Sequence, residues 1–126
     1  MELCRGDIVV VNFNPTKGNE IGKLRPAIII SHDEDNSVLD TVIVIPLSTV
    51  IEPDTAPYRV HIRAREKLQK DSDACIYEVR ALSQVRIKEK LAQLSDNELL
   101  HIQNCLCEIL KWWLFCKHIT LFTKQT

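Results

Sequence analysis

Ile-Val-Val-Val-Asn-Phe, at residues 8–13, is the first of three apolar runs on which the fold prediction for this 126-residue chain rests. Its β-branched and aromatic side chains favour a strand, and the Asn-Pro pair that follows is a turn signal. Two similar runs occur at residues 26–30 and at residues 41–45, the second of which Pro46 is expected to stop. All three runs are continuously apolar and do not alternate. We therefore predict strands that are buried on both faces, as in a small barrel.

Weaker signals fill the middle of the chain. Residues 32–40 are acidic and are expected to form a loop. Residues 58–63 alternate between apolar and basic or histidine side chains, which predicts a half-buried strand. One or two helical turns are expected at residues 64–70, and further strands at residues 74–79 and 85–87.

A helix is expected in the last third of the chain. Ser95-Asp96-Asn97-Glu98 matches a capping box, in which the serine hydroxyl accepts from a backbone N–H and the glutamate reaches back. Apolar residues then recur at helical spacing: Leu99, Ile102, Leu106, Ile109, Leu110 and Trp113. Short strands followed by one long helix predict an α+β fold built on a compact barrel. The aromatic tail over residues 112–126 is expected to be an extension of this domain.

Length and composition indicate an ordinary globular domain. Hydrophobic residues make up 45% of the chain and charged residues 26%. The formal net charge is −1, so a globally basic nucleic-acid-binding surface is not expected. No apolar run reaches the roughly 18 residues of a membrane span, and the N-terminus lacks the apolar region of a signal peptide. We expect a single cytosolic domain over residues 1–126 that does not bind a membrane.

The sequence lacks the common motifs for metals and nucleotides. Its 5 cysteines include no Cys-x-x-Cys pair, which favours reduced thiols over a disulfide framework or a zinc site. The 4 histidines form no local cluster. A Gly-x-Ser-x-Gly elbow, a Walker-type loop and a dinucleotide motif are all missing. We therefore expect neither a metal nor a cofactor.

Two positions at strand ends carry groups that suit phosphate chemistry. Arg25 stands at the start of the second strand, and its guanidinium fork matches phosphate oxygens. The alternative is an ion pair with Glu20 that anchors the preceding polar segment. Ser48 follows the third strand, where its hydroxyl either donates to a developing oxyanion or satisfies a turn. Local sequence alone favours the structural role at both positions.

Several segments in order resemble the MazF/PemK toxins of bacterial toxin–antitoxin systems. They are Arg5-Gly6-Asp7, Gly18-Asn19-Glu20, Gly22, Arg25-Pro26, Pro46-Leu47-Ser48, Asp71-Ser72, Val79-Arg80 and Arg86-Ile87. The resemblance implies a small SH3-like antiparallel β-barrel with a C-terminal helix, a homodimer and a location in the bacterial cytoplasm. It also implies metal-independent endoribonuclease activity on single-stranded RNA that leaves a 2′,3′-cyclic phosphate and a 5′-hydroxyl. An antitoxin would block the RNA groove with a flexible peptide.

The resemblance also implies roles for individual residues. Arg25 would stabilise the dianionic transition state, Ser48 would donate to a phosphate oxygen, and Glu20 would orient Arg25 or act as a base. The RNA-binding candidates are basic, aromatic or polar: Phe13, Lys17, Asn19, Lys23, Thr49, Tyr58, Arg59, Arg63 and Glu78. Glu78 stands where many relatives carry glutamine, and Ser48 keeps the hydroxyl of the commoner threonine.

Two other functions fit a barrel of this kind. One is a binding toxin that poisons gyrase, like the CcdB proteins, which act through a C-terminal Trp-Gly-Ile. This chain ends in Thr123-Lys124-Gln125-Thr126, which disfavours that function. The other is an inactive interaction module, for which the carboxylate of Glu78 is the best support.

Overall fold

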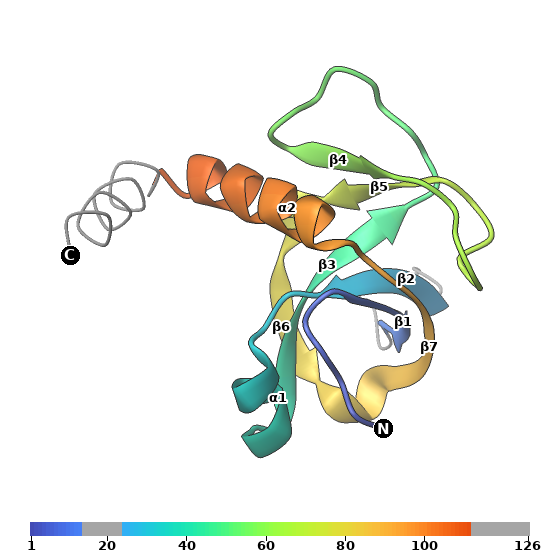
Figure 1. The fold of residues 1–126 in the computed structure, drawn as a ribbon, viewed down its shortest axis with the longest axis vertical. Coiled ribbons are helices and arrows are strands. Elements are labelled where there is room, and N and C mark those ends of the chain that lie inside the picture. The colour runs from blue at the N-terminus through green and yellow to red at the C-terminus, as the bar shows by residue number, and fades with distance from the viewer. Residues whose placement is uncertain (14–23, 112–126) are drawn as a thin grey trace, which may run out of the picture.

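Residues 1–13 and 24–111 are described in a computed structural model of the chain. They form seven strands, two α-helices and two single 3₁₀ turns (Figure 1). In chain order these are β1 (Asp7–Asn12), β2 (Leu24–Ile29), α1 (Asp33–Val38), β3 (Thr41–Ser48), β4 (Arg59–Ile62), β5 (Ser72–Cys75), η1 (Ile76–Glu78), β6 (Arg80–Ser83), η2 (Gln84–Arg86), β7 (Ile87–Gln93) and α2 (Asp96–Ile109).

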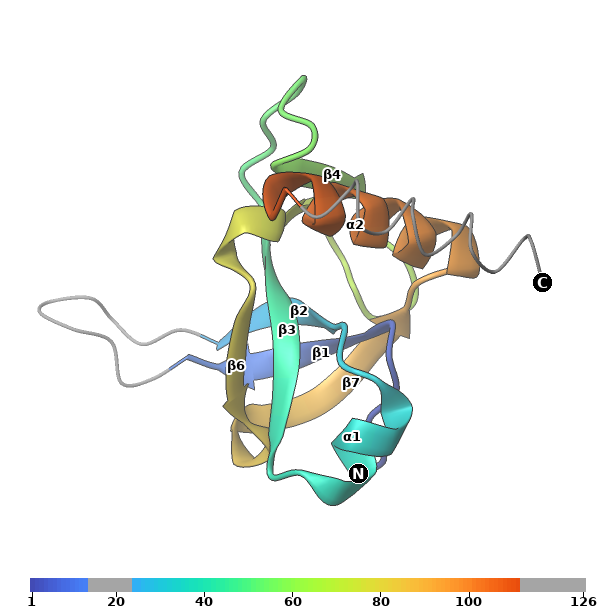
Figure 2. The ribbon, with the colours of Figure 1, turned by 90° about the vertical axis from the view of Figure 1, so that its left-hand side faces the viewer.

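The strands form one antiparallel sheet in the order β4-β5-β3-β2-β1-β7, and β6 pairs with β3. β3 is the long strand that joins the two halves of the sheet (Figure 2). Its first residues, Thr41 to Val44, pair with β6, whereas Leu47 and Ser48 at its end pair with β5. The α+β prediction is confirmed. Among the described residues β4 and β7 each pair with one strand, so the sheet does not close into a complete barrel.

The apolar runs of β1 and β2 are buried on both faces, as predicted, whereas the run of β3 alternates at its start, where Thr41 and Ile43 are exposed. Ile8 joins a core cluster that includes Ile102 and Cys105 of α2, so α2 covers this face of the sheet. Val9 and Val11 join a second cluster on the opposite face, with residues of β2, β3, β6 and β7. All three β1 residues are fully buried. This arrangement explains why the run shows no alternation of polar and apolar residues.

The expectation that Pro46 stops the third strand is wrong, because β3 continues to Ser48. Pro46 lies opposite Ala27 of β2. On its other edge β3 changes partners here, since its pairing with β6 ends at Val44 and its pairing with β5 begins at Leu47. A residue without an N–H is tolerated at such a gap in the ladder.

Two further local expectations are also wrong. The acidic stretch after β2 forms α1, where the His32 side chain caps the helix by accepting from the Glu34 N–H at 3.1 Å. Residues 64–70 form no helix, since Arg65 and Leu68 exchange two backbone hydrogen bonds across a tight reversal at Glu66, whose φ is +49°. Short polar segments of this kind give no periodic signal, so the sequence pattern could not identify them.

The last strands also differ from their expected bounds. The strand expected at residues 74–79 ends at Cys75 and is followed by η1. Residues 85–87 lead through η2 into β7, which extends to Gln93. β7 carries consecutive exposed residues, Lys88 to Lys90, and its pairing with β1 shifts register twice. Because of these irregularities, β7 lacks the alternation of apolar and polar residues by which a strand is recognised in a sequence.

The predicted capping box of α2 is confirmed. The Ser95 hydroxyl accepts from the Glu98 N–H at 3.2 Å, and the Glu98 carboxylate accepts from the Ser95 N–H at 2.9 Å. Ile102 and Cys105 are the buried residues of this helix. Neither helix in the described part of the chain is long and apolar enough to span a membrane.

Candidate active site

Arg25 and Ser48 lie on neighbouring strands at the same end of the sheet. Ala27 of β2 is opposite Pro46 of β3. The β2–β3 ladder ends at this pair, and its register, extended by two residues along each strand, has Arg25 opposite Ser48 with both side chains on one face. Residues directly opposite each other in an antiparallel pair typically have Cβ atoms about 4.5–5.5 Å apart. The extended register therefore predicts that a cation and a hydroxyl lie close together at the ends of these strands.

Arg25 is exposed and carries an uncompensated charge within the described structure. It pairs with Val11 of β1 through the backbone. Its side chain makes no ion pair with any residue in the ranges 1–13 and 24–111. The predicted alternative, an ion pair with Glu20, falls outside the described residues. The predicted RNA-binding residues Lys17, Asn19 and Lys23 also lie outside them.

Ser48 is half-buried, and its side chain has a defined local contact. The backbone N–H of Val50 donates to the Ser48 hydroxyl oxygen at 3.1 Å. A serine hydroxyl can accept in this way and still donate its own hydrogen. The turn-forming role and a donor role toward a phosphate oxygen are therefore compatible in the same side chain.

A second arginine borders this face beside Phe13. The Arg80 guanidinium carbon lies 5.4 Å from the centroid of the Phe13 ring, a cation–π distance. Arg80 pairs with Val44 of β3, whose side chain belongs to the same core cluster against which Phe13 packs. Sequence analysis missed Arg80 as a site residue. Phe13 has one ring face beside this cation, and its predicted stacking with RNA stays a prediction.

The segment after Ser48 is held down by a buried carboxylate. Asp73 of β5 pairs with both Ser48 and His61 through the backbone, and it is 2% exposed. Its carboxylate accepts from the Glu52 N–H at 2.8 Å and lies 3.5 Å from both the Arg59 guanidinium and the His61 ring. Asp73 thus fixes the backbone at Glu52, four residues beyond Ser48.

Arg59 completes this anchor. Its guanidinium donates to the Val50 carbonyl at 3.0 Å and pairs with the Glu52 carboxylate at 3.4 Å. These contacts give Arg59 a structural role, and its predicted contact with RNA stays a prediction. His61 also lies 3.3 Å from the Asp71 carboxylate. The pKa of Asp71 is lowered, mainly because the Ala64 N–H donates to it and secondarily because of His61.

The remaining predicted RNA-binding residues near these strands are exposed. The Tyr58 and Tyr77 rings lie 6.2 Å apart and are tilted at 49°, so they form one exposed aromatic pair. Glu78 is exposed at the end of η1, and Arg63 is exposed just beyond β4. Each of these residues lies on or beside β4, β5 or η1, whereas Arg25 is on β2.

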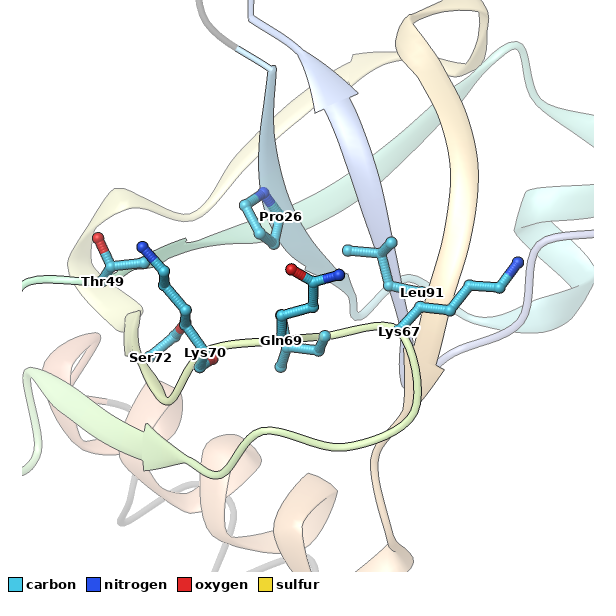
Figure 3. Close-up of a pocket in the computed structure, with 8 residues that line it drawn as sticks. Pro26, Thr49, Lys67, Gln69, Lys70, Ser72 and Leu91 are labelled. Atoms are coloured by element: carbon cyan, nitrogen blue, oxygen red, sulfur yellow. The ribbon is translucent and has the colours of Figure 1, made fainter.

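A pocket of about 240 Å³ opens at the same strand ends as Arg25 and Ser48 (Figure 3). Its lining includes the predicted Thr49 and several residues that sequence analysis missed. They are Pro26, Lys67, Leu68, Gln69, Lys70, Ser72 and Leu91. The missed residues come mainly from the β4–β5 connection. Residues 51–90 hold 9 Lys or Arg against 7 Asp or Glu, and this local basic excess is a weak sequence signal for this part of the chain.

The connection that lines the pocket is anchored to α2. The Arg65 guanidinium forms a bidentate ion pair with Glu98, with N–O distances of 2.5 and 2.6 Å. This pair lowers the pKa of Glu98 from its ordinary value of 4.5 to about 2, and the N–H of Ser95 contributes in the same direction. The same glutamate therefore caps α2 and holds the pocket-lining segment.

Glu98→Gln is expected to lower the free energy of unfolding at pH 7 by about 2 kcal/mol, because it removes charge-assisted hydrogen bonds. A carboxylate with a depressed folded-state pKa stabilises the fold above its unfolded pKa. The difference between wild type and variant should therefore shrink as the pH falls from about 4.5 to about 2. Urea unfolding at several pH values measures it, with Glu89→Gln on β7 as an exposed control. A difference that persists unchanged at low pH would contradict the assignment.

No group of three or more His, Cys, Asp or Glu side chains within the described residues could hold a metal ion. Cys4, Cys75 and Cys105, in this part of the chain, are free thiols. Burial raises the pKa of Cys75 and of Cys105. These thiols are therefore protonated packing residues at neutral pH.

Comparisons with known proteins agree with this architecture. A family model described as "PemK-like, MazF-like toxin of type II toxin-antitoxin system" matches residues 4–110. Endoribonuclease MazF of Staphylococcus epidermidis is 36% identical over 105 residues, which cover 82% of this chain and 88% of that protein. The protein of the same name from Staphylococcus saprophyticus gives the same identity and coverage.

Solved structures share the fold. A MazE–MazF structure from Deinococcus radiodurans matches with a TM-score of 0.73 and 24% identity, over 88% of this chain and 97% of that one. A mycobacterial endoribonuclease in complex with its cognate antitoxin matches with a TM-score of 0.65 and 16% identity, over 87% and 94% of the two chains. These likenesses confirm the fold class predicted from the sequence.

Proposed function

The chain belongs to the PemK-like, MazF-like toxins of type II toxin–antitoxin systems, and on this premise we propose that it is an endoribonuclease that cleaves single-stranded RNA without a metal ion. Cleavage of messenger RNA in the bacterial cytoplasm would inhibit translation. This reaction requires a cation and a hydrogen-bond donor, and the residues at the ends of β2 and β3 are of these types.

The proposed reaction is a transesterification within the RNA itself. The 2′-oxygen attacks the neighbouring phosphorus, its proton passes to a base, and the bond from phosphorus to the 5′-oxygen breaks. The leaving 5′-oxygen takes up a proton, so the products are a 2′,3′-cyclic phosphate and a 5′-hydroxyl. Because the nucleophile belongs to the substrate, the protein needs to supply only proton transfer and charge stabilisation.

One observation carries the proposal: the exposed Arg25 guanidinium, which has no ion pair among the described residues, and the Ser48 hydroxyl share one face of adjacent strands in the β2–β3 register. Arg25 would stabilise the extra negative charge at phosphorus, and Ser48 would donate to a non-bridging oxygen. We assign Glu20 to orienting Arg25. An arginine is a poor base, since its pKa exceeds about 12.

The remaining predicted residues would bind the RNA strand on either side of the scissile phosphate. Phe13, with Arg80 beside its ring, supports a nucleotide contact on the Arg25 face. We keep Lys17, Asn19, Lys23, Thr49, Tyr58, Arg59, Arg63 and Glu78 as proposed RNA ligands. A homodimer and an antitoxin peptide that competes with RNA are proposed as the partners of this chain.

Incubating the wild-type protein with a mixed-sequence single-stranded RNA in excess EDTA tests the function. We expect cuts at discrete sites, with 5′-hydroxyl ends that polynucleotide kinase labels without prior phosphatase treatment. Retention of activity in EDTA would support the metal-independent reaction. Intact RNA in the presence of folded protein would reject it, and gyrase binding would then be the next property to measure.

A further inference from the structure

We propose that the pocket between the β4–β5 connection and the ends of β2 and β3 binds one nucleotide of the RNA beside the scissile phosphate, and that Gln69 reads its base. This inference rests on the proposed function and adds a specificity-determining residue to it. It is supported by the size, the charge and the rigidity of the pocket.

The pocket shares its strand ends with the proposed catalytic pair. Pro26 follows Arg25 on β2, and Thr49 follows Ser48 after β3. Neighbouring residues of a strand project to opposite faces. Arg25 and Ser48 therefore face one side of these strand ends, while Pro26 and Thr49 line the pocket on the other. An RNA strand that bends around these ends would place a neighbouring nucleotide in the pocket.

The size and floor of the pocket suit a nucleobase. Its volume of about 240 Å³ is below the range of roughly 300–1,000 Å³ that is usual for drug-sized ligands. Pro26, Leu68 and Leu91 supply apolar surface, and Leu68 is itself a buried core residue. Apolar surface combined with a few polar groups is the usual composition of a small-molecule site.

The charged groups of the pocket are placed to hold phosphates on both sides of that base. Figure 3 shows Lys70 on the side of Thr49 and Lys67 on the side of Leu91, with Gln69 between them. Neither lysine makes an ion pair with a residue that the structure describes. Two cations that have no ion pair in the described part of the chain and that flank an apolar floor match a nucleotide whose base is bound between successive phosphates.

Gln69 is the group suited to reading the base. Its amide offers both a donor and an acceptor, the combination that recognises base edges in nucleic acids. The side chain is exposed and projects between Pro26 and Leu91 in Figure 3. Lysine, by contrast, has donors only and serves phosphate oxygens without base preference.

The segment that carries these side chains is fixed before any ligand binds. The Lys67 N–H donates to the Leu91 carbonyl at 2.9 Å, which ties the segment to β7. The Ser72 hydroxyl donates to the Lys70 carbonyl at 3.2 Å, and the Arg65–Glu98 pair ties the segment to α2. A preorganised segment loses less conformational entropy on binding than a mobile one.

The experiment compares Gln69→Ala, the double variant Lys67→Ala/Lys70→Ala, and the control Lys111→Ala. Lys111 is exposed beyond the C-terminal end of α2, about 20 Å along the helix from Glu98. Each protein is titrated by fluorescence anisotropy with uncleavable 2′-O-methyl homohexamers of adenine, cytosine and uracil, at several salt concentrations. Cut sites in a long mixed-sequence transcript are mapped in parallel.

We expect Gln69→Ala to reduce the base preference of binding about 10-fold, and to relax the cut-site sequence at one position while other positions keep theirs. We expect the double lysine variant to weaken binding of all three hexamers. Its slope of log affinity against log salt should fall by about 1.4, which is about 0.7 for each lost phosphate contact on a single strand. The control should match wild type in both measurements.

Unchanged base preference and cut sites in Gln69→Ala would overturn base reading, and an unchanged salt slope would overturn phosphate binding. Weaker binding of polyglutamate by the lysine variant, with unchanged RNA binding, would overturn the proposal and assign the pocket to an acidic peptide. A wild-type protein that binds the hexamers but cuts no RNA would reject the proposed function alone, because binding to the hexamers does not depend on cleavage.

Discussion

Arg25→Ala is expected to lower the rate of RNA cleavage about 10³-fold. The guanidinium is exposed at the start of β2, makes no ion pair within the described structure, and faces the same side as Ser48. A cation at the phosphorus acts on charge that is larger in the transition state than in the bound substrate. The loss should therefore appear mainly in the single-turnover rate constant, with RNA affinity reduced far less.

Arg25→Lys separates charge from geometry. The lysine keeps the positive charge but lacks the planar fork that contacts two phosphate oxygens, so we expect only a partial recovery of the rate. Lys111→Ala removes a distant exposed cation and should cleave like wild type. An Arg25→Ala protein that is folded and cleaves within a few-fold of wild type would contradict the assignment of Arg25 as a catalytic residue.

The sequence predicted the elements whose burial leaves a strong pattern. The runs that became β1 and β2 are apolar because their residues pack into core clusters on both faces of the sheet, and β3 does the same from Val44 onward. The capping box at Ser95 identified the start of α2 because the cap is a local interaction between residues three apart. Both signals are properties of short stretches, so neither depends on knowing the tertiary structure.

The candidate site could not be predicted from short stretches of sequence alone. Arg25 and Ser48 were recognised through resemblance to a family, since local sequence favoured a structural role for each. What relates them is the β2–β3 register, which aligns positions that are 23 residues apart in the chain. The pocket was missed because residues 64–70 were expected to be helical. A reversal at Glu66 instead places Lys67, Gln69 and Lys70 around one opening.

Ser48→Ala is expected to lower the cleavage rate about 10²-fold, the usual cost of one lost donor to a developing oxyanion. The hydroxyl also accepts from the Val50 N–H, so the variant should lose up to about 1 kcal/mol of stability as well. Ser48→Thr keeps a hydroxyl at this position and should retain most of the activity. Single-turnover rates of the three proteins on one mapped cut site, together with urea unfolding, separate the two effects.

A phosphorothioate at the scissile phosphate distinguishes donation by Ser48 from a purely structural role. Sulfur accepts hydrogen bonds weakly, so replacing the non-bridging oxygen that Ser48 contacts should slow the wild-type protein for one of the two diastereomers. Ser48→Ala has already lost that hydrogen bond, and its rate should be nearly the same for the oxygen and the sulfur substrates. Equal sulfur effects in wild type and Ser48→Ala would show that the hydroxyl serves only the turn at Val50, and the proposed donor would then have to be another group near Arg25.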